Sequence, residues 1–243
     1  MSETRIAMWS GPRNISTAMM YSFDNRQDSY CSDEPLYAHY LDRTGITHPG
    51  AQKVVDSGET NWEKVVDSLC GEIPNGAEIW YQKHMTHHLL PHIGLDWISK
   101  LTNCLLIRDP REVLLSMSKK TDQIDVMATG IPQQNRLFNH LLETTGEVPT
   151  IVDSRDILKN PERMLSKLCD VLEIPFDKSM LSWPAGPREC DGVWAEYWYD
   201  AVWESTGFAQ YRPRIGELSP EYQVFYDECQ IFYDRLHSYR MKF

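Results

Sequence analysis

The sequence predicts an α/β fold with a parallel sheet, and three observations support this prediction. A short apolar run is joined by a tight turn to a helical pattern over residues 5–20. Residues 103–107 form another apolar run of strand length, and helix-start signals follow it directly. The 243 residues, 42% of them hydrophobic, can bury a sizeable core, so we expect one domain over residues 1–243.

The first stretch, residues 5–20, predicts a strand, a loop and a helix in that order. Ile6 and Met8 belong to the apolar run, which suits a buried strand. Gly11 and Pro12 end that strand, because glycine permits unusual backbone angles and proline cannot continue a central strand. A loop of this kind directs backbone N–H groups and a helix N-terminus at one point, which favours an anion.

The same loop carries side chains that suit a phosphate group. Arg13 adds a positive charge, and Ser16 and Thr17 add hydroxyl donors. We name the whole candidate segment the anion loop; it comprises Gly11, Pro12, Arg13, Asn14, Ile15, Ser16 and Thr17. It lacks the Gly-Lys-Ser/Thr end of an ATP-type P-loop, so it suits an anion without an obligatory metal. The alternative is an ordinary strand-to-helix turn with an exposed arginine.

The later part of the chain alternates expected strands and helices. Further strands are expected at residues 28–32, 78–82, 103–107 and 149–153. Further helices are expected at residues 61–69, at 113–117, around 137–142, from Pro161 onward and at 220–240. Between the second strand and the helix at 61–69 we expect a polar connection through Gly45, His48, Pro49 and Gly50.

Charged residues are expected at the C-terminal ends of these strands, where open α/β sheets bind ligands. Asp33 and Glu34 precede Pro35, which cannot lie inside a sheet, so both carboxylates are placed at the end of the second strand. Arg108 ends the fourth strand, and Ser116 lies about two turns into the following helix. The alternative is that Arg108 pairs with a carboxylate and that Ser116 is a surface residue.

Lys83, His84 and His87 accompany the end of the third strand. A lysine and histidines in this position can serve acid–base chemistry or hold a metal. No cluster of carboxylates or thiolates lies nearby in the sequence, so we expect no metal. The alternative for some of these histidines is that they only cap and pack.

Composition excludes several classes of function. The formal net charge of −11 argues against general binding to nucleic acid or to anionic membranes. Six scattered cysteines without a Cys-x-x-Cys pair indicate free thiols in a reducing cytosol. No signal segment and no run of membrane-spanning length is found, so we expect a cytoplasmic location and no membrane partner.

Taken together, these elements resemble the sulfotransferases that use 3′-phosphoadenosine-5′-phosphosulfate (PAPS). The anion loop is similar to the family's 5′-phosphosulfate loop, which usually reads Pro-Lys/Arg-Ser-Gly-Thr-Thr. Arg108 and Ser116 resemble the family's 3′-phosphate pair, an arginine at a strand end and a serine eight residues later. Residues 186–192, with Arg188, resemble the late Arg-Lys-Gly loop that closes over the same phosphate.

The resemblance implies a three-layer, P-loop-like α/β fold whose central parallel sheet is flanked by helices. It implies transfer of a sulfuryl group from PAPS to an acceptor hydroxyl or amine, with 3′-phosphoadenosine-5′-phosphate (PAP) as product and no metal requirement. Arg13, Ser16 and Thr17 would then hold the 5′-phosphate and the bridging oxygen, where charge builds up. Residues 14–15 replace the usual Ser-Gly, which leaves the backbone angles of the loop open.

The resemblance also leaves the catalytic base open. Cytosolic family members carry Lys-x-His on the third strand; Lys83 fits this pattern, but Met85 stands where the histidine should be. In the branch that resembles trehalose and glycosaminoglycan sulfotransferases, a carboxylate at the end of the second strand is the base, and Glu34 has this position. His84 and His87 are the alternatives, because imidazole suits proton transfer near neutral pH.

The sequence therefore predicts a PAPS-dependent sulfotransferase with a small-molecule acceptor. One alternative is a non-catalytic nucleotide-binding or partner module that kept the anion loop and lost the base. Another is a metal-dependent kinase of small molecules, which the missing P-loop lysine disfavours. The aromatic-rich residues 194–203 and the acidic charge balance would suit a neutral or cationic alcohol or amine. The sequence names neither the acceptor nor the oligomeric state.

Overall fold

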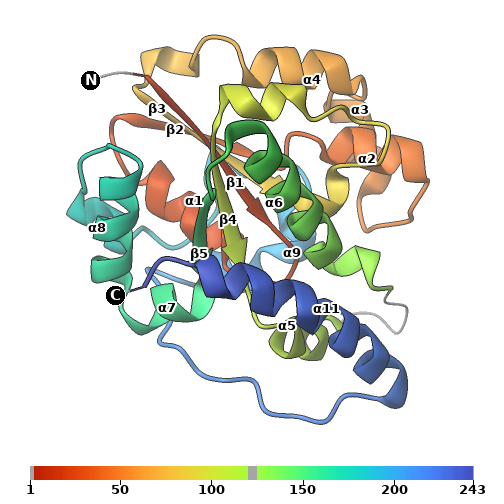
Figure 1. The fold of residues 1–243 in the computed structure, drawn as a ribbon. Coiled ribbons are helices and arrows are strands. Elements are labelled where there is room, and N and C mark those ends of the chain that lie inside the picture. The colour runs from red at the N-terminus through yellow and green to blue at the C-terminus, as the bar shows by residue number, and fades with distance from the viewer. Residues whose placement is uncertain (1–2, 120–124, 243) are drawn as a thin grey trace.

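The computed structural model describes residues 3–119 and 125–242, and five parallel strands form one central sheet within them (Figure 1). The strands lie in the order β2-β3-β1-β4-β5, so β1 is in the middle. Their bounds are Thr4–Ser10 for β1, Ser29–Asp33 for β2, Ile79–Met85 for β3, Thr102–Ile107 for β4 and Thr150–Asp153 for β5. All five expected strands are confirmed. The third is longer than expected, so Lys83 and His84 lie inside β3.

The helices connect the strands and cover both faces of the sheet. Those up to β4 are α1 (Ser16–Asp24), α2 (Tyr37–Thr44), α3 (Ala51–Ser57) and α4 (Trp62–Leu69). The later ones are α5 (Pro110–Met117), α6 (Ile131–Thr145), α7 (Ser154–Lys159), α8 (Pro161–Val171), α9 (Ala195–Trp198), α10 (Asp200–Trp203) and α11 (Pro220–Tyr239). No helix in the described part of the chain combines the length and apolarity needed to cross a membrane.

Two apolar cores lie on opposite faces of the sheet. The first is formed with α1, α7 and α8 and includes Met8 and Leu106; the second is formed with α4, α6 and α11 and includes Trp9 and Leu105. Neighbouring residues serve different cores because successive side chains of a strand point to opposite faces. The resulting helix–sheet–helix arrangement (Figure 1) confirms the predicted fold class.

The connections after β1 and β4 diverge at the C-terminal edge of the sheet. α1 follows β1 and packs on the first core, whereas α5 follows β4 and packs against α11, which covers the second core. In a parallel sheet such a divergence opens a crevice beyond the strand ends, where ligands bind. The anion loop and Arg108 lie at this edge of the sheet, because they follow β1 and β4 directly.

The connection expected through Gly45, His48, Pro49 and Gly50 is a loop in the structure, but it joins two helices that the sequence did not predict, α2 and α3. Apolar residues of these helices pack against Trp194 and Tyr199, near the other end of the chain. α2 ends at Gly45, whose φ of 66° lies in the left-handed region that suits a helix C-terminus. The helices were missed because their apolar partners are distant in sequence and each helix is short.

We predict that Gly11→Ala destabilises the protein. A Cβ atom at Gly11 would lie 2.2 Å from the carbonyl oxygen of Thr129, which is backbone and cannot rotate away. The expected loss in free energy of unfolding is about 1–3 kcal/mol, as for other overpacked positions. Gly94→Ala is the control, since the nearest atom to its new Cβ is a ring carbon of Trp62 at 3.9 Å. Urea unfolding of both variants checks this, and equal stability would contradict it.

Candidate active site

The anion loop leads from β1 into the first turn of α1. Asn14 Nδ2 donates to the carbonyl oxygen of Leu106 at 2.9 Å, which ties the loop to β4, and the Ile15 N–H donates to Asn14 Oδ1 at 2.9 Å. Arg13 has a φ of 57°, in the left-handed region that side chains other than glycine rarely adopt. Ile15, the N-cap residue of α1, makes no side-chain cap hydrogen bond. The positive end of the α1 dipole is therefore not neutralised by a capping side chain.

Arg13, Arg108 and Ser116 come together beside this loop. Arg13 Nε donates to Ser116 Oγ at 3.0 Å, and Arg108 Nη1 donates to the carbonyl oxygen of Arg13 at 2.7 Å. Arg108 also pairs with Glu112 at 2.7 Å. Burial lowers the pKa of Arg13, and the positive charges of Arg214 and Arg108 lower it further. This cluster concentrates positive charge in an otherwise acidic protein and suits a ligand with more than one phosphate.

Arg188 does not join the cluster. Its Nε donates to Asp24 Oδ2, Nη2 donates to Asn25 Oδ1 at 3.3 Å, and its guanidinium lies over the ring of Tyr21. These partners lie on or just after α1, at the end of the helix away from the anion loop. The structure thus gives Arg188 an ion pair with Asp24 and does not place it beside Arg13.

Arg214 is the arginine that sequence reasoning missed. It precedes α11, and Arg111 Nη2 donates to the nearby carbonyl oxygen of Gly216 at 2.7 Å, which holds this segment against α5. Residues 212–216 read Arg-Pro-Arg-Ile-Gly, so a late loop with arginines and a glycine was visible in the sequence. Residues 186–192 also contain an arginine between glycines, and the sequence alone did not show which segment returns to the anion loop.

Lys83 holds two carboxylates together near the end of β3. Its Nζ lies 2.7 Å from Asp33 Oδ1 and 2.7 Å from Glu34 Oε1, and it donates to the Tyr199 hydroxyl at 2.5 Å. Only 1% of the lysine side chain is exposed. Burial alone would lower the pKa of Lys83, but the two carboxylates and Tyr199 raise it well above its ordinary value. Lys83 is therefore a fixed positive charge.

Glu34 follows β2 in a strained conformation, with a φ of 43°. Its N–H donates to the carbonyl oxygen of Lys83 at 2.9 Å, and the Tyr37 N–H donates to the carbonyl oxygen of Glu34 at 2.9 Å, so both sides hold it in place. Burial raises the pKa of Glu34; Lys83 opposes this shift and Asp33 adds to it. A raised pKa brings a carboxylate nearer the range that suits a general base at neutral pH.

The two histidines that compete with Glu34 are neutral, and His84 is buried whereas His87 is half-buried. His84 stacks on Trp9 with ring centroids 4.1 Å apart, whereas Lys83, its neighbour on β3, faces Glu34. Burial lowers the pKa of His84 and of His87 to about 3 in each case. His87 Nδ1 has no hydrogen-bond partner among the described residues. An imidazole with such a pKa is a weak base at neutral pH.

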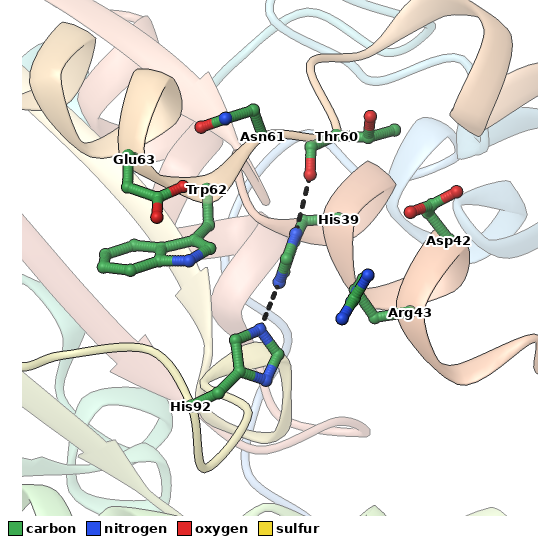
Figure 2. A pocket seen from close by; sticks show the side chains of 8 residues that line it. All are labelled: His39, Asp42, Arg43, Thr60, Asn61, Trp62, Glu63 and His92. Carbon is green, nitrogen blue, oxygen red and sulfur yellow. Dashed lines mark hydrogen bonds between the residues drawn. The ribbon is translucent and has the colours of Figure 1, made fainter.

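A separate pocket with a cavity volume of about 330 Å³ lies between α2 and the start of α4 (Figure 2). His39 crosses it, with Nδ1 2.7 Å from the carbonyl oxygen of Thr60 and Nε2 2.9 Å from Nε2 of His92. None of the expected site residues lines this pocket. Over residues 3–119 and 125–242, no three His, Cys, Asp or Glu side chains are grouped so that they could hold a metal ion.

Comparison with known proteins decides the family. A sequence profile described as "Sulfotransferase domain" matches residues 4–234. The chain belongs to the sulfotransferase family. Two curated relatives of this chain, from Arabidopsis thaliana, are named branched-chain-amino-acid aminotransferase-like proteins 1 and 2. They are 39% identical over 217 residues and 37% identical over 205 residues, which is 88% and 84% of this chain. The chain spans only 38% and 36% of their lengths.

Solved structures share the fold at low sequence identity. The sulfotransferase domain from the curacin biosynthetic pathway has a TM-score of 0.55 and 15% identity, and the match covers 94% of this chain and 98% of that domain. A sulfotransferase from Alicyclobacillus acidocaldarius has a TM-score of 0.55 and 8% identity, covering 100% and 98%. Mouse sulfotransferase SULT7A1, complexed with PAP, has a TM-score of 0.55 and 13% identity, covering 98% and 90%.

We predict that Lys83→Met strongly destabilises the protein, because it leaves Asp33 and Glu34 buried without their counter-charge. Breaking a buried pair in this way costs about 3–5 kcal/mol of unfolding free energy. Lys53→Met is the matched control, since Lys53 pairs with Glu196 at 2.8 Å on the exposed surface and such pairs contribute little. The measurement is urea unfolding at neutral pH. Similar losses in both variants would show that Lys83 is not a structural centre.

Proposed function

We propose that the protein is a PAPS-dependent sulfotransferase that acts on a hydroxyl or amine of a small-molecule acceptor. The observation that carries this proposal is the meeting of Arg13, Arg108 and Ser116 at the N-terminus of α1. Glu34 lies at the same edge of the sheet, directly after β2. Strand β3 lies between β2 and β1, the strand that leads into the anion loop. The family supports the reaction type, and PAP in the mouse structure of the same fold supports the donor.

The two ends of the donor would use different parts of the site. Arg13, Ser16 and Thr17, with the first turn of α1, would hold the 5′-phosphosulfate. Arg108 and Ser116 would hold the 3′-phosphate, and the charge of Arg214 would strengthen the same cluster. Donors held ready at the bridging oxygen stabilise the charge that appears there as the sulfuryl group leaves.

Glu34 would act on the acceptor. Its carboxylate takes the proton from the acceptor hydroxyl or amine, whose oxygen or nitrogen forms a bond to sulfur. The bond from sulfur to the 5′-phosphate oxygen breaks, and PAP leaves with the electron pair. Lys83 donates a hydrogen bond to Glu34 Oε1, so Oε2 is the oxygen that would take the acceptor proton. Because Glu34 works in its ionised form, its raised pKa should make turnover fall as the pH drops through that value.

Two alternatives have less support. A nucleotide-binding module without catalysis would not need a strained, buried carboxylate at the sheet edge, and Glu34 has that strain. A small-molecule kinase would need a lysine where the anion loop has Ile15.

As to location, all six cysteines are free thiols, which supports a reducing compartment such as the cytosol.

We predict that Arg108→Gln weakens PAP binding much more than adenosine 5′-phosphate binding, which loses only what the contact of Arg108 with the Arg13 carbonyl oxygen contributes. Loss of a charged hydrogen bond to the 3′-phosphate should cost about 1.5–3 kcal/mol, or about 10- to 100-fold in Kd. Titration calorimetry with both nucleotides measures this difference. The wild-type protein should prefer PAP, and an equal loss of affinity for both nucleotides would remove Arg108 from this role.

We predict that Glu34→Gln lowers turnover by about 10²–10⁴-fold, the usual contribution of a general base. PAP affinity should stay the same, because a carboxylate gains nothing from a phosphate. The assay incubates labelled PAPS with a library of small metabolites and detects products that have gained a sulfuryl group.

His84→Ala and His87→Ala serve as comparison variants in the same assay. If either loses turnover while Glu34→Gln keeps it, the base is an imidazole. If PAP binds but no metabolite is sulfated, the module without catalysis becomes the better description.

A further inference from the structure

His88 is buried beside the proposed base, and its ring stacks on two tyrosine rings. It is the last residue of the short 3₁₀ turn Thr86–His88 that follows β3, and 2% of it is exposed. Its imidazole stacks on Tyr37 with centroids 4.8 Å apart and planes at 3°, and on Tyr40 with centroids 4.6 Å apart. Tyr37 is itself anchored, because its hydroxyl lies 2.8 Å from Nδ1 of His48. The ring of His88 therefore has little freedom to reorient.

This fixed ring presents one nitrogen to the base. His88 Nε2 lies 4.0 Å from Glu34 Oε2, the carboxylate oxygen that Lys83 does not hold. The two atoms are beyond hydrogen-bond distance, and a shift of about 1 Å in the Glu34 carboxylate, which Lys83 holds by Oε1, would close the gap. The other nitrogen, Nδ1, has no partner among the described residues.

The surroundings keep His88 uncharged. Burial lowers the pKa of His88 well below its ordinary value, and His87, His48, Lys83 and His84 lower it further. A neutral imidazole carries one N–H. With the hydrogen on Nε2, the atom nearest the carboxylate is a donor; with the hydrogen on Nδ1, Nε2 would bring a lone pair near the carboxylate instead. The Nε2–H form is therefore favoured.

We propose that His88 is a positioning residue for Glu34, whose Nε2–H donates to Oε2 and holds the carboxylate in the orientation that receives the acceptor proton. The inference rests on the proposed role of Glu34 as base. Lys83 would fix one oxygen and His88 the other, and Oε2 keeps a second lone pair for the acceptor. His88 itself takes up no proton in this arrangement.

The first test uses the wild-type protein without nucleotide. Nitrogen-15 NMR of the imidazoles should show His88 neutral at pH 7 with its hydrogen on Nε2, and its shifts should change as the Glu34 carboxyl titrates. A hydrogen on Nδ1 would overturn the proposal, because Nε2 would then have no hydrogen to donate. An imidazolium at pH 7 would also overturn it, because the proposed donor is a neutral ring.

The second test follows the Glu34 carboxyl by carbon-13 NMR in His88→Phe and His88→Gln. Phenylalanine keeps the stacked ring and removes the donor, so the Glu34 pKa should rise by about one unit. Glutamine keeps an N–H donor and should restore most of the wild-type value. Tyr40→Phe, which keeps the ring face against His88, is the matched control and should leave Glu34 unchanged. The other titratable groups that interact with Glu34 are the same in all variants; they are Lys83, Asp33, Tyr37 and Tyr199.

These titrations separate the inference from the proposed function. If Glu34 titrates identically in wild type and His88→Phe, His88 does not position it, whatever the activity of the protein. If the titrations behave as expected but Glu34→Gln keeps full turnover, the contact exists and the proposed base is wrong. With both correct, His88→Phe should lower kcat about tenfold and leave the Kd for PAP unchanged.

Discussion

The rest of the site depends on one interaction, the pairing of the buried Lys83 ammonium group with Asp33 and Glu34. It joins Asp33 and Glu34 at the end of β2 to β3, and Tyr199 carries the network to the other end of the chain. The Tyr199 hydroxyl also donates to Asp33 Oδ2 at 2.7 Å, and the Gly192 N–H reaches the same oxygen at 3.2 Å. Two carboxylates could not be buried here without a cation, so the lysine sets where the acidic residues and the late aromatic segment lie.

The same edge of the sheet carries two groups of charged residues. Arg13 and Arg108 meet after β1 and β4, where Arg108 also pairs with Glu112, whereas Asp33 and Glu34 share Lys83 after β2. Among the described residues, Arg13 and Glu34 are two of the four non-glycine residues with positive φ. Each is held in that conformation by its neighbours, and strain of this kind is maintained where a side chain must point in one direction. Arg13 and Arg108 would suit an anionic donor, whereas Glu34 would suit an acceptor that loses a proton.

The strands, the turn from β1 into α1 and the place of Arg108 at the end of β4 could be predicted from the sequence because each depends on local spacing. A strand shows as an apolar run, and a residue that follows it lies at the strand's end whatever the order of the sheet. The side of β3 on which His84 lies could not be predicted, because it depends on the pairing of β3 with β1 and on the stacking with Trp9. Other features that depend on contacts between residues distant in the sequence could not be predicted for the same reason.

Two such features are the presence of helices α2 and α3 and the choice between Arg188 and Arg214 as the arginine near Arg13. α2 and α3 are stabilised by residues 194–199, which a local window does not contain. Arg188 and Arg214 occur in similar sequence surroundings, and only the packing of α11 against α5 decides which of them returns to Arg13. The role of His88 was missed too, since its significance comes from two tyrosines about fifty residues earlier and not from its neighbours.

The segment that carries Arg214 has a thermodynamic consequence for any ligand of the arginine cluster. It is attached to the body by hydrogen bonds such as Arg111 to Gly216 and Tyr211 to Glu112, while Ile215 is 93% exposed. A ligand bound by both Arg13 and Arg214 bridges the beginning and the end of the chain, so its affinity includes the free energy of keeping this segment docked. By linkage, binding would stabilise the docked segment, and anything that pulls on residues 209–219 would loosen the ligand without touching the anion loop.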